Sequence, residues 1–344
     1  MRGMHQSAAT LAEFHAELSE TLAFGPSYPV PSGLMLSNHL PMALHALHRL
    51  GAPRAVLERH RKAWTPRLLR VEPGSPVAGA AQASANPYLQ ALAALQDEAA
   101  GREPSTWLGP RLARLLDVPE ASAFHGAIRL AHALEGGHGG EILRAVAAWQ
   151  AARDGRVARQ PGGVPIPGWE SPARIDIAQA LSVARADEAV AFAPRRGTTI
   201  VSDMDAAQAL PAFDHHAAAF APTLDQLAEA SLAVYLATRD FTALHLVTGT
   251  RALRVLLEAV PLDEAVRRRS LARTARAWLA AWVSIGRPEP DFAAVHAGPA
   301  GEDAWDAALP RVFASGDDHV IKLADASREE WRRRGWAGYR SCLG

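Results

Sequence analysis

Near its C-terminal end the chain reads Asp317-Asp318-His319-Val320-Ile321-Lys322-Leu323, and the residues around this stretch predict a helix over about 317–334. Residues three apart in a helix share a face, so His319 and Lys322 project together, and their apolar neighbours indicate that this face points inward. A buried ammonium group without a partner is costly to desolvate. We therefore expect both side chains to bind one metal ion, with the other ligands supplied by distant helices.

Apolar residues recur at helical spacing along most of the chain, and alternating runs of β-branched residues are scarce. Glycine- and proline-rich stretches predict loops at 24–33, 71–87 and 154–171, and the only predicted strand is 198–201. The fold class expected is mainly α, a single large helical domain over residues 1–344 with an irregular excursion at about 154–171 and a helix-borne metal site in the core. The predicted helices are 11–18, 38–50, 53–64, 88–100, 105–116, 121–135, 140–153, 173–187, 223–238, 240–259, 263–285, 302–314 and 317–334.

The composition excludes several classes of protein. The chain has 36 basic and 36 acidic residues, so it lacks the basic excess of a nucleic-acid-binding protein. Its single cysteine, Cys342, excludes an intramolecular disulfide and suits a reducing compartment. No run of about 18 uncharged apolar residues predicts a membrane span, and the N-terminal stretch carries acids that a signal peptide would not have. We expect a cytoplasmic protein with no nucleic-acid or membrane partner, and the oligomeric state stays open.

Of the 14 histidines, four lie in apolar helical contexts on four different predicted helices: His39, His125, His245 and His319. Helical bundles build metal sites from inward side chains on facing helices. Imidazole suits iron, zinc, copper and nickel, so these residues alone do not select the metal. The alternative for each is a hydrogen-bonded core histidine, which is the commoner role of a lone histidine on an apolar face.

Two further residues on the helix of His125 are candidate catalytic residues. Arg129 shares a face with His125, and we expect it to pair with Asp317, Asp318 or an anionic group of the substrate. An ordinary buried salt bridge is the alternative for Arg129. His132 lies seven residues after His125, and we expect it to support a ligand or to replace one.

The remaining histidines are interpreted as structural. His45 and His48 are expected on the flank or surface of the helix that follows His39, and Asp214-His215-His216 is expected in a solvated turn. The chain also lacks the nucleophile-elbow, zinc-protease, phosphate-loop and dinucleotide-binding motifs. Bound flavin or nicotinamide therefore has no recognisable site.

Several short motifs, in order along the chain, resemble those of the questin oxidase-like proteins. The resemblance spans about residues 37 to 323. The motifs are Asn38-His39-Leu40-Pro41-Met42-Ala43-Leu44, then Trp107-Leu108-Gly109, then Phe124-His125-Gly126 with Leu134-Glu135, then His245-Leu246-Val247-Thr248, and last Asp318-His319-Val320-Ile321-Lys322.

This resemblance implies an oxygenase. Members of the family are associated with oxidative ring opening of anthraquinones, described as Baeyer–Villiger-type or as dioxygenase cleavage. The resemblance implies a polycyclic aromatic, quinone or related ketone as the substrate and dioxygen as the co-substrate, with NADPH as a candidate external reductant.

The resemblance also implies a metal site. A branch of the family holds non-haem iron, Fe(2+), through four histidines and a lysine carboxylated on its side-chain nitrogen. The matching positions here are His39, His125, His245, His319 and Lys322. Carboxylation is chemically reasonable, because burial lowers the pKa of a lysine and the neutral amine can take up carbon dioxide. Two other functions stay open: a metal-free α-helical binding or scaffold protein, and a zinc hydrolase that uses the same ligands.

Overall fold

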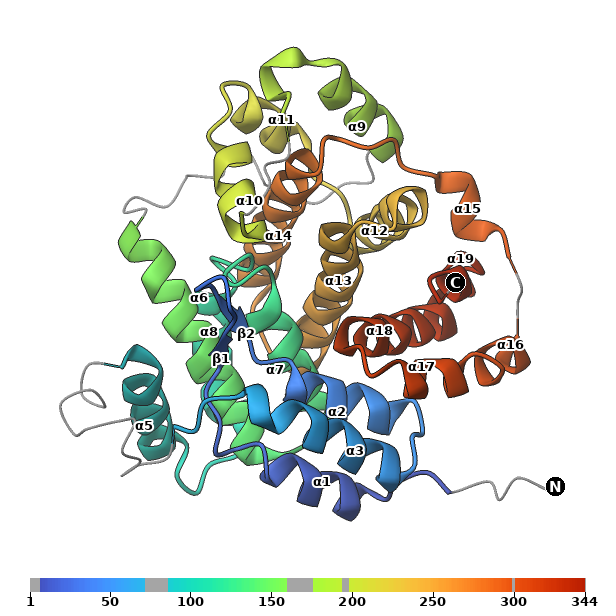
Figure 1. The fold of residues 1–344 in the computed structure, drawn as a ribbon. Helices are drawn as coiled ribbons and strands as arrows, with labels where there is room; N and C mark the ends of the chain where they lie inside the picture. The colour runs from blue at the N-terminus through green and yellow to red at the C-terminus, as the bar shows by residue number, and fades with distance from the viewer. Residues whose placement is uncertain (1–6, 72–85, 160–175, 194–197, 299–300, 344) are drawn as a thin grey trace.

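The computed structural model describes residues 7–71, 86–159, 176–193, 198–298 and 301–343. Helices make up most of this part of the chain (Figure 1). Its only strands are β1 (Ser27–Pro29) and β2 (Met35–Ser37), which pair as an antiparallel hairpin. The prediction of a mainly α fold is confirmed.

The N-terminal half begins with a helix whose first turn is capped by the side chains of Thr10 and Glu13. The side chain of Thr10 accepts a hydrogen bond from the backbone N–H of Glu13, and the Glu13 side chain accepts one in return, so two otherwise unpaired donors are satisfied. The helices of this half are α1 (Leu11–Ser19), α2 (Leu40–Arg49), α3 (Arg54–Trp64), η1 (Thr65–Arg67), α5 (Pro87–Ala99), α6 (Pro104–Leu115), α7 (His125–Gly136) and α8 (Gly139–Arg159).

The longest helices of the C-terminal half also begin at side-chain caps, which Thr223, Asp240, Asp263 and Asp317 provide. The helices of this half are α9 (Ile177–Ala186), η2 (Glu188–Val190), α10 (Ile200–Gln208), α11 (Phe213–Ala219), α12 (Leu224–Thr238), α13 (Phe241–Ala259), α14 (Glu264–Ser284), α15 (Phe292–His296), α16 (Glu302–Asp306), α17 (Leu309–Ser315), α18 (Asp318–Arg334) and α19 (Gly338–Ser341).

The predicted strand at 198–201 is wrong. The run of β-branched residues there contains the start of α10, because the side chain of Thr199 accepts from the backbone N–H of Ser202 and caps the helix. The predicted helix at 302–314 is two helices, α16 and α17, and Pro310 lies in the first turn of α17. Proline is tolerated in that position and disfavoured inside a longer helix.

Two predicted loops also differ from the structure. The stretch 24–33 contains β1 and the turn of the hairpin. Helix α8 continues to Arg159, six residues past its predicted end at 153. Residues 72–85 and 160–171 of the other two predicted loops lie outside the described residues.

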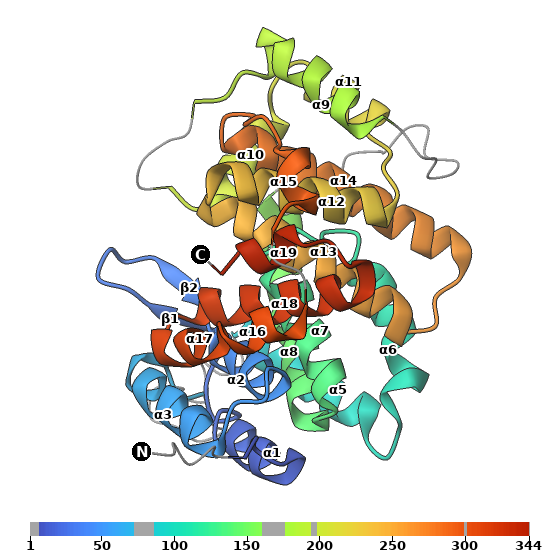
Figure 2. The same cartoon turned by 90° about the vertical axis from the view of Figure 1, so that its right-hand side faces the viewer.

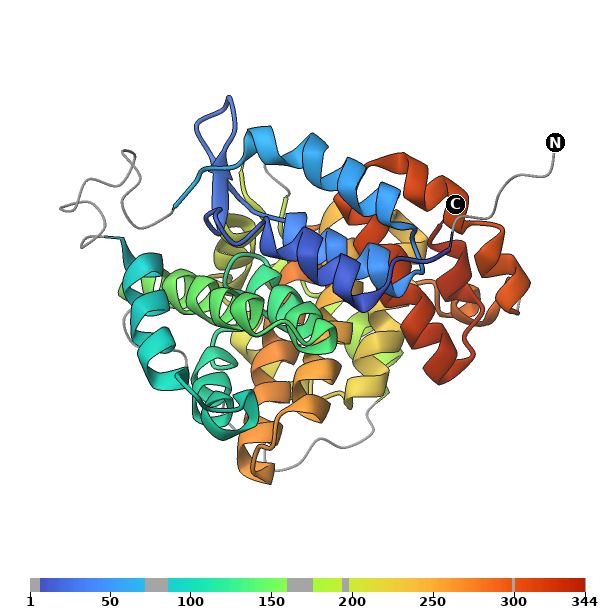
Figure 3. The same cartoon turned by 90° about the horizontal axis from the view of Figure 1, so that it is seen from below.

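Four helices from distant parts of the chain close a ring. Helix α2 packs against α7 and α18, and α13 packs against the same two helices (Figure 1). Figure 2 shows α9 and α11 at the far end of the molecule from α1 and α3, and Figure 3 shows α1, α2 and α3 side by side. Helices α1, α3, α8, α12, α14, α17 and α19 pack directly against this ring.

The ring lies where two hydrophobic clusters meet. Met42 of α2 and Leu323 of α18 belong to the larger cluster, whereas Leu40 and Ile321 of the same two helices belong to the smaller one. Lys322 is fully buried between these two apolar surfaces. Polar groups enclosed at such a boundary need partners from the ring itself.

Candidate metal centre

The four predicted histidines all lie near helix N-termini of the ring. His39 is the N-cap residue of α2, His125 is the first residue of α7, His319 is the second residue of α18, and His245 lies one turn into α13. Side chains in a helix lean towards its N-terminus. Residues in these positions can therefore extend beyond the helix ends to a common point inside the ring.

The structure brings the four imidazole rings together. Nε2 of His125 lies 2.7 Å from Nε2 of His39 and 3.2 Å from Nε2 of His245. The ring centroid of His319 lies 4.6 Å from that of His39 and 5.5 Å from that of His245. Two nitrogen ligands at right angles around a metal ion, each about 2.1 Å from it, would be about 3 Å apart. The observed spacing therefore matches that of neighbouring metal ligands.

Backbone carbonyls fix the protonation of two of these rings. Nδ1–H of His245 donates to the carbonyl oxygen of Phe241 at 2.8 Å, one turn earlier in the same helix. Nδ1–H of His125 donates to the carbonyl oxygen of Ser122. A carbonyl oxygen only accepts, so each Nδ1 carries the proton of the neutral ring and each Nε2 presents a lone pair.

The carboxylate of Asp318 fixes the protonation of a third ring, that of His39. Nδ1–H of His39 donates to the buried carboxylate of Asp318, an arrangement that commonly orients histidine ligands of metals. Nε2 of His125 thus faces the Nε2 lone pairs of His39 and His245 without a proton between them, and Nε2 of His319 is buried with no hydrogen-bond partner. The ligand nitrogens of His39, His125 and His319 all lie within 4.8 Å of one another, so these three residues fit a metal ion, and His245 adjoins them through His125.

A strained turn positions the ring of His125 beside the other histidines of the site. Ser122, Ala123 and Phe124 have φ angles of 54°, 54° and 66°, a left-handed conformation that is costly for residues with a side chain. The turn brings the Ser122 carbonyl to the ring of His125, and α7 starts at His125, not at the predicted residue 121. A Cβ at Gly126 would lie 2.3 Å from Cγ of Trp149, so only glycine fits directly after His125.

The electrostatics favour neutral, ligand-ready side chains. Burial lowers the pKa of His39 and His125 well below the ordinary value, and it lowers the pKa of His245 to about 3. Burial also lowers the pKa of Lys322 to about 8, although Asp318, whose Oδ2 lies 3.8 Å from its Nζ, works in the opposite direction. A neutral amine at Lys322 is therefore accessible near neutral pH.

Comparison with known proteins places this site in a family. Residues 112–326 match the questin oxidase-like family. The chain belongs to the questin oxidase-like family. The matched region includes His125, His245, His319 and Lys322, and His39 precedes it. No curated protein matches the chain.

Membership of the questin oxidase-like family implies an oxygenase.

Among the described residues, no helix has both the length and the apolar character that crossing a bilayer requires.

In this questin oxidase-like protein, Arg129 does not pair with Asp317 or Asp318 but forms a buried salt bridge, which was the alternative, and its pairing with an anionic group of the substrate stays a prediction. Its Nε and Nη2 donate to the two carboxylate oxygens of Glu141, and the Nη2 bond is 2.9 Å long. The packing of α8 against α7 brings Glu141 there, and sequence spacing could not reveal it. Nη1 of Arg129 has no partner, and Arg129 lines a cavity of about 40 Å³ together with His125.

His132 is buried farther along the ring, away from the four clustered histidines. Nδ1 of His132 lies 3.7 Å from Oδ2 of Asp325, and its ring centroid lies 6.2 Å from that of His45. Seven residues of helix span about 10 Å, which accounts for the distance of His132 from His125. Its predicted roles beside a ligand stay predictions.

Two other histidine predictions are corrected. His45 is buried, not at the surface, because Gly136 leaves room for it: a Cβ there would lie 2.2 Å from the His45 ring. His216 is buried in α11 and bonded at 2.8 Å to Asp187, so the stretch is not a solvated turn. His48 is half-buried and stacks on Phe14, as expected for a flank.

Sequence reasoning missed two residues of the site. Asp318 was considered only as a partner of Arg129, although its position directly before His319 was visible. Phe241 was not considered at all. Its carbonyl fixes His245, and its ring contacts both His245 and His319, with centroids 4.8 and 4.6 Å away. The spacing of four residues between Phe241 and His245 was the available signal.

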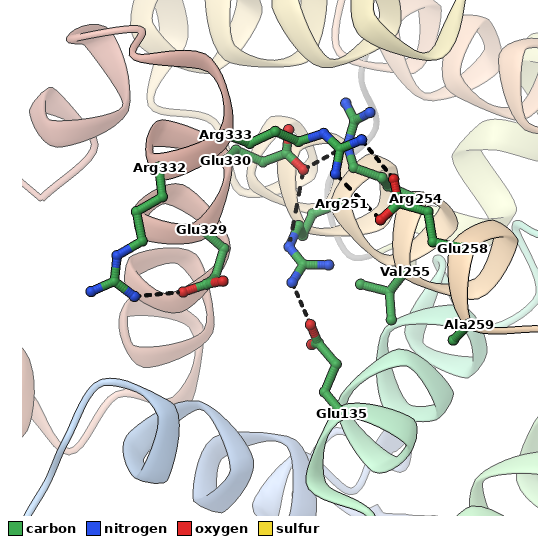
Figure 4. A pocket seen from close by; sticks show the side chains of 10 residues that line it. All are labelled: Glu135, Arg251, Arg254, Val255, Glu258, Ala259, Glu329, Glu330, Arg332 and Arg333. Carbon is green, nitrogen blue, oxygen red and sulfur yellow. Dashed lines mark hydrogen bonds and ion pairs between the residues drawn. The ribbon is translucent and has the colours of Figure 1, made fainter.

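A cavity of about 590 Å³ lies towards the other ends of α7, α13 and α18 (Figure 4). Arginine and glutamate side chains line it and pair with one another. Arg251 contacts Glu135 at 2.5 Å, and Arg333 contacts Glu258 at 2.7 Å. No clustered histidine lines this cavity, and its paired charges give it no evident preference for an ionic ligand.

Proposed function

We propose that the protein is a non-haem iron-dependent oxygenase that opens a ring of a polycyclic aromatic, quinone or related ketone substrate. The observation that carries this proposal is the grouping of His39, His125 and His319, whose ligand nitrogens all lie within 4.8 Å of one another, with Nε2 of His245 lying 3.2 Å from Nε2 of His125. Family membership supplies the oxygenase chemistry. We also propose that the protein is cytoplasmic and that NADPH is a candidate for its external reductant.

Iron(II) would be held by Nε2 of His39, His125, His245 and His319, with a carboxylated Lys322 as an oxygen ligand. Neutral imidazoles suit iron, and an anionic carbamate would offset the charge of a buried cation. The lowered pKa of Lys322 supports this modification, because only the neutral amine takes up carbon dioxide. Iron, when bound, would supply the activation of dioxygen.

The chain's own groups prepare the site. Asp318 and the carbonyls of Ser122 and Phe241 keep each Nδ1 protonated and each Nε2 free to bind. Arg129 stays a candidate catalytic residue, because its unpartnered Nη1 could donate to a substrate oxygen in the small cavity beside His125. His132 stays a candidate catalytic residue that supports or replaces a ligand, and its buried Nδ1 has no hydrogen-bond partner.

The test is metal analysis of the purified protein, followed by electron paramagnetic resonance of the anaerobic protein with nitric oxide. We expect about one iron per chain in the wild type, and loss of that iron in His245→Ala and Lys322→Ala. His215→Ala, at an exposed histidine of α11, is the matched control and should retain iron.

Oxygen consumption with an anthraquinone substrate, measured with and without NADPH, completes the test. Zinc in the protein together with turnover in the absence of oxygen would establish a hydrolase instead. Metal-free wild-type protein, with His245→Ala indistinguishable from it, would leave a binding or scaffold protein.

A further inference from the structure

The four-histidine cluster is more open on one side than on the others. His39, His245 and Lys322 are buried and His125 is partly buried, whereas the side chain of His319 is 19% exposed. The cavity beside His125 has a volume of about 40 Å³, which suits water or another very small molecule but not an aromatic ring. A ring-bearing molecule would therefore approach over His319.

One aromatic side chain lies at this open side. Phe241 is 53% exposed, and every other phenylalanine, tyrosine or tryptophan side chain that the structure describes is at least partly buried. Its ring meets those of His245 and His319 at interplanar angles of 70° and 62°, so both contacts are edge-to-face. The backbone of Phe241 is held as well, because it begins α13 after the Asp240 cap and accepts from His245.

Burying an aromatic ring is strongly favourable, so a half-exposed ring invites a partner. Offset stacking between flat rings adds to the gain from area alone. Phe241 is fixed on two of the clustered histidines, so a ring stacked on its exposed face would lie beside the candidate metal centre. A saturated ketone of similar size would gain only the free energy of burying apolar surface, without the contribution from ring stacking.

We propose that Phe241 is the substrate-binding platform of this protein, and that it selects substrates with a flat aromatic ring system. This inference rests on the proposed function for the identity of the reacting centre. It assigns the preference for aromatic substrates to one side chain at the open side, between the solvent and His319.

The experiment measures binding of 9,10-anthraquinone-2-sulfonate, a soluble flat tricyclic quinone, to anaerobic protein by titration calorimetry. Phe241→Leu keeps an apolar side chain and removes the ring, and we expect its Kd to rise about three- to tenfold. Phe241→Trp should bind as tightly as the wild type or more tightly. Phe292→Leu, at a half-buried phenylalanine of α15 outside the ring, is the matched control and should bind like the wild type.

A saturated probe and the iron content separate binding from shielding. A decalone carboxylate, which has no aromatic ring, should bind wild type and Phe241→Leu equally. Equal binding of the quinone to wild type and Phe241→Leu would overturn the inference. So would faster iron loss to a chelator in Phe241→Leu with an unchanged quinone Kd, since Phe241 would then only shield the histidines. Absence of iron from the wild type would instead overturn the proposed function, so the two failures are read from different measurements.

Discussion

Removing the carboxylate of Asp318 should weaken metal binding without unfolding the protein. This carboxylate is buried, accepts Nδ1–H of His39 and lies 3.8 Å from Nζ of Lys322. It therefore holds one proposed ligand, His39, in the correct tautomer. Loss of such a supporting group costs about 10- to 100-fold in metal affinity, which is about 1.4 to 2.8 kcal/mol.

Two substitutions should fall at the two ends of this range. The amide oxygen of Asp318→Asn can still accept from His39 but carries no charge, so we expect about a tenfold loss of affinity. Asp318→Ala removes the acceptor as well, so we expect about a hundredfold loss. The assay is anaerobic titration of metal-free protein with iron(II) in competition with a fluorescent chelator.

The matched control is Asp263→Asn, which replaces the cap of α14 by another good capping residue. It should leave both iron affinity and the urea midpoint close to those of the wild type. If Asp318→Ala is folded by the same urea criterion and binds iron as tightly as the wild type, then Asp318 does not prepare His39 and the reasoning is wrong.

Two further predictions concern buried charges beside the centre. Arg129→Met should lower the free energy of unfolding by about 3 to 5 kcal/mol, because it leaves the fully buried Glu141 carboxylate without its partner. The double variant Arg129→Met/Glu141→Leu should recover most of that loss in urea unfolding, and a loss below about 1 kcal/mol in the single variant would contradict the prediction. Burial raises the pKa of Asp325 to about 6 from 3.8, so the folded state holds this proton more tightly than the unfolded state does. The stability from that proton is complete below about pH 4 and is lost as the pH rises through about 6. Asp325→Asn does not ionise, so its free energy of unfolding relative to the wild type should rise by up to roughly 3 kcal/mol between pH 4 and pH 8. A difference that stays constant over this range in urea unfolding would exclude the raised pKa.

Local sequence was a good guide to the long helices and a poor guide to irregular segments. Helical spacing of apolar residues is repeated over many turns in α13 and α18, so it survives small errors. The segment at 198–201 is short. The hydroxyl of Thr199 caps α10 there, and this interaction outweighs the β-propensity of the neighbouring residues. The left-handed turn at 122–124 contains no glycine from which a positive φ angle could be predicted. The surrounding packing holds these residues in a strained backbone conformation.

The candidate site shows the same division. An apolar context marked His39, His125, His245 and His319 as inward-facing, and the ordered motifs identified the family that the comparison confirms. No local pattern could pair Arg129 with Glu141, because that contact depends on how α8 packs against α7. The burial of His45 likewise depends on the missing side chain of Gly136 on another helix.

By itself, the sequence determined that the chain is mainly helical and that His39, His125, His245 and His319 face inward, because both properties follow from the periodicity of the helix. Only the tertiary structure decided that four helix ends meet, that Asp318 sets the tautomer of His39, and that the ring of Phe241 contacts His319 at the open side. The physical reason is distance along the chain. Hydrogen bonds and ring contacts between residues far apart in sequence depend on packing across the whole ring, which no local pattern records.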